Sequence, residues 1–321
     1  MKKVLLRNFT FLHDQSQVCN PISYLGLYPK LIAMYKILVL AKQVPDTRAV
    51  GKDAMKADGT VNRAALPAIF NPEDLNALEM ALVVKDQYPD THITLLTMGP
   101  IRAAEILREG LYRGADAGVL LTDKAFAGSD TLATSYALAC SIKKIGDVDL
   151  IFAGRQAIDG DTAQVGPQVA DKLGLPQITY AEELLLLKGK TIQIKRRLEK
   201  GIETIEASLP VVITVHGTAP QCRPRNAKSL MKYKKARTLS ELSNTSEDFM
   251  TLREDKPYLS ITEWNMKDVD PDPTQLGLGG SPTKVKQIEN IVFQAKDSKI
   301  ITTEEEIEDL IRELITNRTM G

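Results

Sequence analysis

The chain has 321 residues, of which 43% are hydrophobic and 26% charged, and its 41 basic residues balance its 41 acidic ones. This length suits one large α/β domain with an appendage, or two small domains. The balanced charge gives no field that would attract nucleic acid or a membrane surface, and the apolar runs are shorter than the roughly 20 residues of a membrane span. We therefore expect a soluble, cytoplasmic protein.

Residues 1–33 differ from the rest of the chain, because polar residues occur among them without a steady period. They also interrupt each apolar stretch, which argues against a signal peptide. We expect this segment to be a disordered extension, or the product of a start codon assigned too far upstream. We assign it no function.

From Met34 onward, apolar runs of strand length alternate with helix-like segments, which is the pattern of βαβ units. The runs are apolar throughout, as in a parallel sheet covered on both faces. The expected strands are residues 36–41, 93–98, 118–121, 150–153 and 210–215. The expected helices are residues 75–85 behind a cap at 71–74, residues 103–112, and residues 131–145 behind a cap at 129–131. The sequence therefore predicts an α/β fold with a doubly wound, mostly parallel sheet.

The pattern changes in the last third of the chain. Residues 191–197 and 202–207 flank a Glu-Lys-Gly turn and predict a β-hairpin. Prolines and glycines are too frequent over residues 268–283 for regular structure, which is typical of a segment laid across another surface. A last helix is expected over about 304–316, where Thr303 and Glu306 have capping-box spacing. Its apolar stripe has to cover the main domain or a partner chain: Ile307, Leu310, Ile311, Leu314 and Ile315.

The most informative stretch follows the strand at 150–153. Gly154, Gly160 and Gly166 occur in it together with Asp159, Asp161, Thr162 and Gln164. An ordinary strand-to-helix loop, the alternative interpretation, needs only one glycine and one cap. In a parallel sheet this loop lies on the ligand-facing rim, where the N–H groups and positive dipole end of a helix suit a phosphate. We expect a nucleotide here, with the helix beginning near Gln164 or Val165 because Pro167 fits a first turn.

Two further segments belong to the same rim. The Asn71-Pro72 turn precedes a helix, and residues 97–100 follow a strand. No catalytic constellation accompanies them, because the three histidines are scattered and none stands near a serine or cysteine in a nucleophile setting. The three cysteines form no CxxC pair, so we assign no metal ligand and no disulfide framework. Any redox chemistry has to come from a cofactor.

Several motifs stand in the order in which one known family carries them. They are residues 40–46 (LAKQVPD), Asn71-Pro72 with Glu79, Met98-Gly99-Pro100, residues 154–159 (GRQAID) through Gln164, and Pro224-Arg225-Asn226. In these motifs the chain resembles the beta subunit of electron-transfer flavoproteins, from Met34 to the C-terminus. The resemblance implies a fold of the adenine-nucleotide alpha-hydrolase-like or flavodoxin-like kind.

The resemblance also implies a domain organisation and a partner. Residues 34–217 would form the nucleotide-binding domain, and residues 218–321 a recognition loop and a C-terminal arm that packs on an alpha subunit. The recognition loop, at about 219–231, would engage partner dehydrogenases. It departs from the family at Ala227-Lys228-Ser229, where many relatives carry a longer turn that contains Leu-Pro. The basic run over 228–237 is open to two interpretations, partner docking or a solvated helix face.

In this family the alpha subunit makes most of the contacts to an electron-transferring FAD, and the beta subunit holds a second nucleotide. The resemblance assigns that nucleotide to the following residues of this chain: Leu40, Ala41, Lys42, Asn71, Pro72, Glu73, Asp74, Met98, Gly99, Asp130, Thr131, Thr134, Arg155, Gln156, Ala157, Ile158, Asp159, Gly160, Asp161, Thr162, Ala163, Gln164, Val165 and Gly166. Backbone N–H groups from Thr162 to Gly166 would hold phosphate.

The second nucleotide is AMP in the simple electron carriers and FAD in the electron-bifurcating members. Residues 130–135, 159–167 and 276–283 are similar to the bifurcating group, and the small residues Gly160 and Ala163 leave room for a pyrophosphate and a second ring system. The alternative is an AMP site in which the small residues at these two positions arose by neutral drift and have no effect on the ligand.

The expected function is that of an electron-transfer subunit in a flavin-dependent oxidoreductase complex. NADH would deliver a hydride to the beta-bound FAD, and the electrons would go to an acyl-CoA-type dehydrogenase and to a low-potential carrier such as ferredoxin or flavodoxin. One alternative is a simple carrier between an acyl-CoA dehydrogenase and a quinone reductase, with AMP in the beta subunit. The other is an adenine-nucleotide-binding module without redox work. No nucleic acid or membrane partner is expected.

Overall fold

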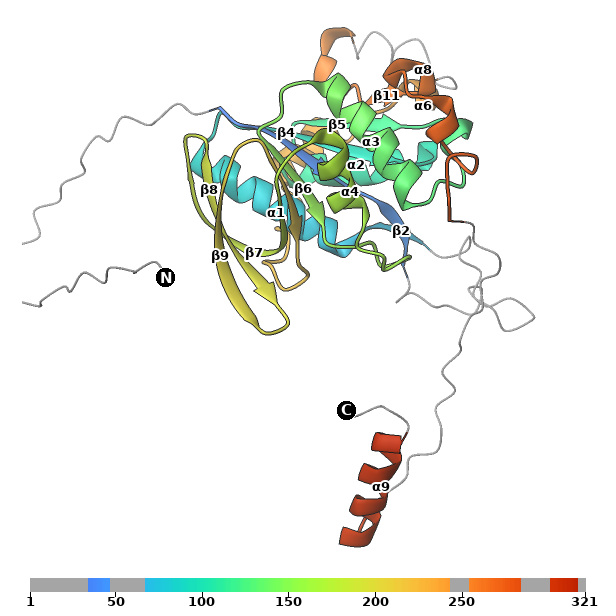
Figure 1. Ribbon diagram of the computed structural model, residues 1–321. Helices are drawn as coiled ribbons and strands as arrows, with labels where there is room; N and C mark the ends of the chain where they lie inside the picture. Colours follow the sequence, from blue (N-terminus) through green and yellow to red (C-terminus); the bar gives the residue numbers. More distant parts are fainter. Residues whose placement is uncertain (1–33, 47–66, 243–253, 284–300, 317–321) are drawn as a thin grey trace, which may run out of the picture. The chain divides into compact units, whose positions relative to one another are not determined.

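The computed structural model describes residues 34–46, 67–242, 254–283 and 301–316 (Figure 1). The expectation for residues 1–33 lies outside the described residues. The strands are β1 (Lys36–Leu40), β2 (Gln43–Pro45), β3 (Ala68–Phe70), β4 (His92–Met98), β5 (Ala117–Leu121), β6 (Leu150–Gly154), β7 (Gln177–Lys188), β8 (Thr191–Leu198), β9 (Gly201–Ser208), β10 (Val211–Val215) and β11 (Thr262–Trp264). The helices of two or more turns are α1 (Pro72–Gln87), α2 (Ala104–Arg113), α3 (Thr131–Ile145), α4 (Val165–Leu173), α5 (Ala227–Tyr233) and α9 (Glu304–Thr316).

Short helical turns complete the described chain. They are α6 (Leu239–Leu242), α8 (Met266–Val269) and the 3₁₀ turns η2 (Ile101–Ala103), η3 (Lys124–Phe126), η4 (Pro257–Leu259) and η5 (Pro273–Gln275). Among the described residues, no helix combines the length and the apolar character that a membrane crossing requires.

The main sheet has nine strands in the order β11-β5-β4-β1-β6-β10-β7-β8-β9. The pairs from β11 to β7 are parallel, and β7, β8 and β9 are antiparallel to one another. From β1 the chain first builds outward through β4 and β5, and then returns to β6 on the other side of β1. This is the predicted doubly wound, mostly parallel α/β fold, and the prediction is confirmed.

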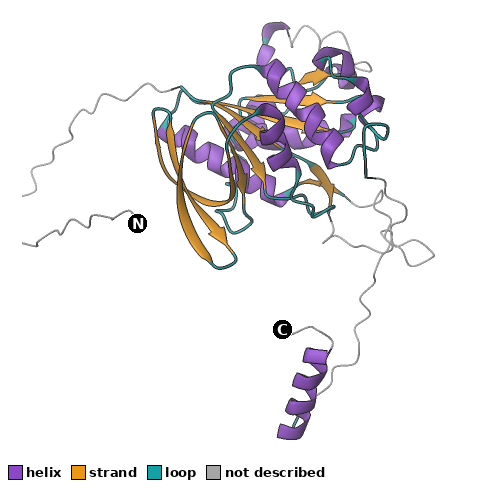
Figure 2. Ribbon diagram, viewed as in Figure 1, coloured by secondary structure: helices purple, strands orange, loops and turns teal. Residues whose placement is uncertain are grey.

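Helices cover both faces of the parallel strands (Figure 2). Because strand side chains alternate, Ile37 and Val39 of β1 enter one core with α1 and α2, whereas Leu38 and Leu40 enter the other with α3 and α4. All four side chains are buried. Burial on both faces explains why the strand sequences are apolar throughout instead of alternating.

The predicted helix boundaries agree closely with the structure. The carboxylate of Asp130 accepts hydrogen bonds from Leu132 N and Ala133 N, both at 3.0 Å, and so caps α3 as expected. Helix α4 begins at Val165, with Pro167 in its first turn. Helix α1 begins at Pro72, three residues before the predicted start, and its N-cap Asn71 makes no capping hydrogen bond with its side chain.

The predicted hairpin is strands β8 and β9, which pair from Thr191↔Ser208 to Leu198↔Gly201. Figure 1 shows β7, β8 and β9 side by side as a long antiparallel ribbon in yellow-green and yellow. The sequence interpretation missed β7, although it has 12 residues. Its pairing with β8 shifts register between Ala181 and Glu183 and again between Leu184 and Leu186, so its side chains do not keep the period of two that marks a strand.

The part of the predicted arm between 257 and 281 packs on its own domain. Strand β11 extends the main sheet beside β5, and Val269 and Leu276 are buried with Leu121 and Phe126. Residues 268–283 are mostly irregular, as expected, apart from the end of α8 and the single turn η5. The predicted domain boundary after residue 217 therefore does not separate this segment from the α/β domain, because β11 belongs to the main sheet.

Helix α9 matches the predicted helix. Glu306 Oε2 accepts a hydrogen bond from Thr303 N at 3.1 Å, and Thr303 Oγ1 accepts one from Glu306 N at 3.3 Å, so the predicted capping box is confirmed. The side chains of Ile307, Ile311 and Ile315 are exposed.

Candidate nucleotide site

The candidate site lies where the winding of the sheet changes direction. The chain leaves β1 toward β4 and leaves β6 toward β10, so a crevice opens outside the carboxyl ends of β1 and β6. A cavity of about 380 Å³ occupies it. The residues that line the cavity are Leu40, Ala41, Lys42, Asp74, Leu96, Met98, Phe126, Gly128, Ser129, Asp130, Thr131, Thr134, Leu138, Ala153, Gly154, Arg155, Gln156, Ala157, Ala163, Gln164, Val165 and Gly166.

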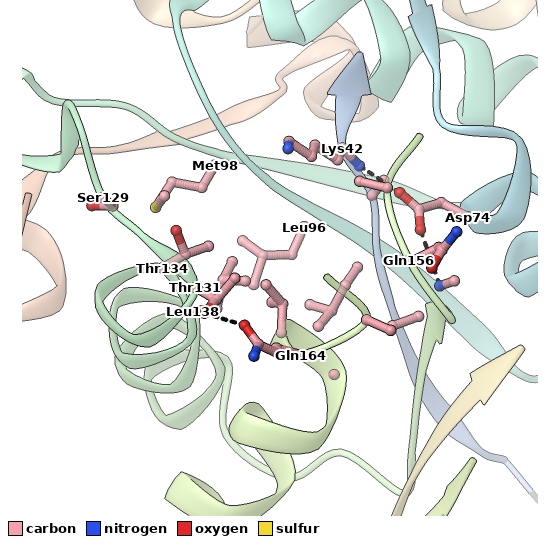
Figure 3. A pocket seen from close by; sticks show the side chains of 18 of the residues that line it. Lys42, Asp74, Leu96, Met98, Ser129, Thr131, Thr134, Leu138, Gln156 and Gln164 are labelled. Carbon is pink, nitrogen blue, oxygen red and sulfur yellow. Dashed lines mark hydrogen bonds between the residues drawn. The ribbon is translucent and has the colours of Figure 1, made fainter. Parts of the chain in front are cut away.

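The walls of the cavity differ in chemistry (Figure 3). Leu96 and Leu138 form an apolar floor, whereas the hydroxyl-bearing Ser129, Thr131 and Thr134 stand on one side of it. Lys42, Asp74 and Gln156 stand on the opposite side. An apolar floor with a few polar groups around it is typical of a small-molecule site.

Backbone N–H groups converge at the start of α4. Ala163 has a left-handed conformation (φ 52°), and Gln164 after it has a right-handed one (φ −106°, ψ −32°). Consecutive residues of opposite hand turn their N–H groups toward one point and form an anion-binding nest. Within the described residues, no acceptor takes a hydrogen bond from the N–H groups of residues 162–166. These donors and the positive end of the α4 dipole suit a phosphate.

Two glycines allow the close packing behind this nest. A Cβ atom at Gly166 would stand 2.5 Å from Thr214 Cγ2, so only glycine lets the first turn of α4 lie this close to β10. A Cβ at Gly154 would stand 2.8 Å from Asp74 N and nearer still to the Asp74 carboxylate. Gly160 differs from both, because a Cβ there would meet no atom within 4 Å.

Side-chain contacts connect the loop after β6 to the elements on the other side of the crevice. Lys42 Nζ lies 2.7 Å from Asp159 Oδ1 in an ion pair, and Thr131 Oγ1 donates to Gln164 Oε1 at 2.9 Å. The Lys42 side chain is 49% exposed, so this pair contributes little to the free energy of unfolding. Its effect is on geometry, because it joins the segment after β1 to the loop after β6.

Two charged groups near the loop titrate abnormally. Hydrogen bonds from the guanidinium of Arg155 to the Glu73 carboxylate, at 2.9 and 3.3 Å, raise the pKa of Arg155. Burial raises the pKa of Asp74 to about 7, although backbone N–H donors from Lys42 and Gly154 oppose that shift. A buried acid with a shifted pKa in a crevice marks a candidate functional site.

The chain matches the electron transfer flavoprotein domain model over residues 58–240. It is 45% identical over 251 residues to the electron transfer flavoprotein subunit beta of Clostridium acetobutylicum, a match that covers 78% of this chain and 86% of that protein. The chain belongs to the electron transfer flavoprotein family. Membership gives it a role in electron transfer, and several of its relatives are named as beta subunits.

Two further relatives carry more specific names. Subunit CarD of the caffeyl-CoA reductase-Etf complex of Acetobacterium woodii is 44% identical over 250 residues, which cover 78% of this chain and 86% of CarD. The acryloyl-CoA reductase electron transfer subunit gamma of Anaerotignum propionicum is 39% identical over 287 residues, 87% of this chain and 98% of that protein.

The predicted site residues divide into two groups. The structure brings one group to the cavity: Leu40, Ala41, Lys42, Asp74, Met98, Asp130, Thr131, Thr134, Arg155, Gln156, Ala157, Ala163, Gln164, Val165 and Gly166. The others do not line it: Asn71, Pro72, Glu73, Gly99, Ile158, Asp159, Gly160, Asp161 and Thr162. Gly99 borders a neighbouring cavity, and Asn71 and Glu73 bind the backbone of the loop.

Six lining residues were not predicted: Leu96, Phe126, Gly128, Ser129, Leu138 and Ala153. Gly154 also lines the cavity and belongs to the predicted loop. Periodicity could have found two of the six, because Leu96 lies on the same face of β4 as Met98, and Leu138 lies one turn after Thr134 on α3. Phe126 lies in a single 3₁₀ turn, which carries no periodic signal. In the described part of the chain, no group of three or more His, Cys, Asp or Glu residues is arranged to hold a metal ion.

Proposed function

We propose that this chain is the beta subunit of an electron-bifurcating electron transfer flavoprotein and that its cavity holds FAD. When bound, that flavin would accept a hydride from NADH and supply single electrons to an acyl-CoA-type dehydrogenase, through an alpha subunit, and to a low-potential carrier such as ferredoxin or flavodoxin. The observation that carries the proposal is the row of free N–H groups over residues 162–166 at the rim of an apolar cavity.

The residues of the chain would act by binding and orientation. The N–H groups of the nest at Ala163 and Gln164 would hold phosphate, and the apolar floor formed by Leu96 and Leu138 would exclude water from an adenine or flavin ring. No side chain needs to act as a nucleophile, since the cofactor supplies the redox chemistry.

The size of the cavity favours a second candidate, a simple electron carrier with AMP in the beta subunit. A volume of about 380 Å³ lies near the lower end of the range for ligand sites and fits one nucleotide. AMP, the nucleotide of a simple carrier, would fill it. FAD would have to extend beyond it, and the open space around Gly160 offers a route along the loop. We favour FAD because Gly160 and Ala163 keep that route free of large side chains.

The partners follow from the same proposal. The names of two relatives connect subunits of this kind with reductases of CoA esters, which supports an acyl-CoA-type dehydrogenase as one partner. The exposed apolar stripe of α9 supports packing of the C-terminal arm on an alpha subunit. The basic helix α5 exposes Lys228 within the predicted recognition loop, where a dehydrogenase would dock, and Lys232 directly after it.

Cofactor analysis of the heterodimer coexpressed with its alpha subunit tests the proposal. We expect two FAD per heterodimer, and bleaching of both flavins on addition of NADH. One FAD and one AMP would contradict bifurcation and support the simple carrier. A stable monomer that copurifies with a colourless adenine nucleotide would contradict both redox functions and support a nucleotide-binding module.

A further inference from the structure

Three polar side chains at the start of α1 bind other segments of the chain. A helix N-cap side chain ordinarily accepts a hydrogen bond from its own first turn, but that of Asn71 makes no such bond. Asn71 is fully buried, and the side chain of Glu73 is only 13% exposed. Buried polar groups of this kind need partners, and here the partners are backbone atoms of the site.

Asp74 connects the two strands that flank the crevice. Its Oδ2 accepts a hydrogen bond from Lys42 N at 2.8 Å, and its Oδ1 accepts one from Gly154 N at 3.0 Å. One buried carboxylate therefore joins the carboxyl end of β1 to that of β6. Although Asp74 lines the cavity, both of its oxygens already accept hydrogen bonds from backbone N–H groups.

Asn71 and Glu73 hold the residues that follow β6. Gln156 N donates to Glu73 Oε2 at 3.0 Å, and the carbonyl oxygen of Gln156 accepts from Asn71 Nδ2 at 2.9 Å. Ile158 N donates to Asn71 Oδ1 at 3.2 Å. Both backbone groups of Gln156 are thus bound by side chains at the start of α1, one from the N-cap Asn71 and one from Glu73.

The loop downstream needs such support. Asp161 and Ala163 both have left-handed backbone conformations, which cost a non-glycine residue of the order of 1 kcal/mol each and persist only where the surroundings impose them. A loop that is ordered before the ligand arrives binds more tightly, because binding no longer has to order it.

We propose that Asn71, Glu73 and Asp74 are positioning residues and form a brace that holds the backbone at Lys42 and over 154–158. The brace sets the direction in which the loop leaves β6 and so the placement of the phosphate-binding N–H groups. The inference rests on the proposed nucleotide site, but it assigns Asn71 and Glu73 no contact with the nucleotide.

The test compares the brace with a matched bond at the other edge of the sheet. Asp149 Oδ2 accepts a hydrogen bond from Lys36 N at 2.8 Å, which also joins the β6 side to β1, but at the amino ends of the strands. The dissociation constant for AMP is measured on the nucleotide-depleted heterodimer of the wild type, Asn71→Ala, Glu73→Gln and Asp149→Asn. Hydrogen exchange of the amides over 154–166 is followed on the same samples.

We expect Asn71→Ala and Glu73→Gln each to weaken AMP binding about tenfold. A tenfold change corresponds to the free energy of roughly one hydrogen bond, which in these variants no longer orders the loop before AMP binds. Exchange over 154–166 should accelerate in both variants and stay unchanged in Asp149→Asn, whose affinity for AMP should remain within about twofold of the wild type.

Two results would overturn the brace. In the first, Asn71→Ala and Glu73→Gln lower the melting temperature but leave the affinity for AMP unchanged. The two residues would then stabilise the fold without positioning the nucleotide site. In the second, exchange over 154–166 is unchanged in both variants. Failure of the wild type to bind AMP or FAD would overturn the proposed function instead, and the exchange measurement would still decide whether the brace holds the loop.

Discussion

The carboxyl edge of the parallel strands and the antiparallel ribbon β7–β9 use charged residues in opposite ways. At the edge, the largely buried acids Glu73 and Asp74 bind backbone N–H groups, as Asp74 does with Lys42 and Gly154. In the ribbon, partly exposed charges pair with one another across strands, as Arg196 does with Glu203 at 2.8 Å. A buried acceptor leaves orphaned donors when it is removed, whereas an exposed ion pair is replaced by water.

This difference separates residues that define the site from residues that only keep the surface polar. Changes at the carboxyl edge should therefore alter stability and nucleotide binding together. Changes in the ribbon should alter neither by much.

The largest effect is expected from pH, acting through Asp74. Its pKa is about 7 in the folded chain and about 3.9 in the unfolded chain. Between these values the folded state binds the extra proton, so the free energy of unfolding falls as pH rises from about 4 to 7, by up to about 4 kcal/mol, and is level above that. Urea unfolding of the wild-type and Asp74→Asn heterodimers at several pH values measures this dependence of the free energy of unfolding on pH. If both lose stability equally over this interval, Asp74 is not the group responsible.

The next effect concerns the space behind Asp74. Gly154→Ala places a methyl group against Asp74 and against its backbone nitrogen, which cannot move aside without shifting α1. We expect a loss of about 3 kcal/mol in the free energy of unfolding, together with loss of the adenine nucleotide. Gly160→Ala is the matched control in the same loop and should stay within about 0.5 kcal/mol of the wild type. Equal effects of the two substitutions would refute this account of the edge.

A smaller effect is expected at the start of α4. Gly166→Ala brings a methyl group to 2.5 Å from Thr214 Cγ2, and the first turn of α4 has to move away from β10. We expect a loss of about 2 kcal/mol. Thr214→Ser removes the opposing methyl group, so the double variant should recover part of that loss. Purely additive losses in the double-mutant cycle would show that the two groups do not meet.

The smallest effect is expected in the ribbon. Arg196→Gln removes a cross-strand ion pair with Glu203, in which the two side chains are 23% and 49% exposed. We expect a change below about 0.5 kcal/mol and an unchanged content of nucleotide. Thermal unfolding at low and high salt measures the effect. A loss comparable to that of Gly154→Ala would remove the distinction between the two regions.

The same distinction explains what the sequence could predict. The strands β1, β4, β5, β6 and β10 were predictable because burial on both faces makes them apolar throughout. The loop at 154–166 was predictable because glycines and capping residues act locally. Strand β7 was not, because its bulges remove the period of two, and β2, β3 and β11 have only three residues each.

The roles of Asn71 and Glu73 could not be predicted either. Their partners, Gln156 and Ile158, lie more than 80 residues away in the sequence, and only the fold brings them together. Sequence position alone placed Asn71 and Glu73 at the rim of the nucleotide site, and their side chains turn out to bind the loop backbone instead.

The most direct test of the whole account is the electron density of the assembled heterodimer at the carboxyl edge of β1 and β6. We predict a dinucleotide whose diphosphate lies within hydrogen-bonding distance of the N–H groups of residues 162–166. An edge filled by side chains, without flavin or adenylate, would contradict the assignment of this crevice as a nucleotide site.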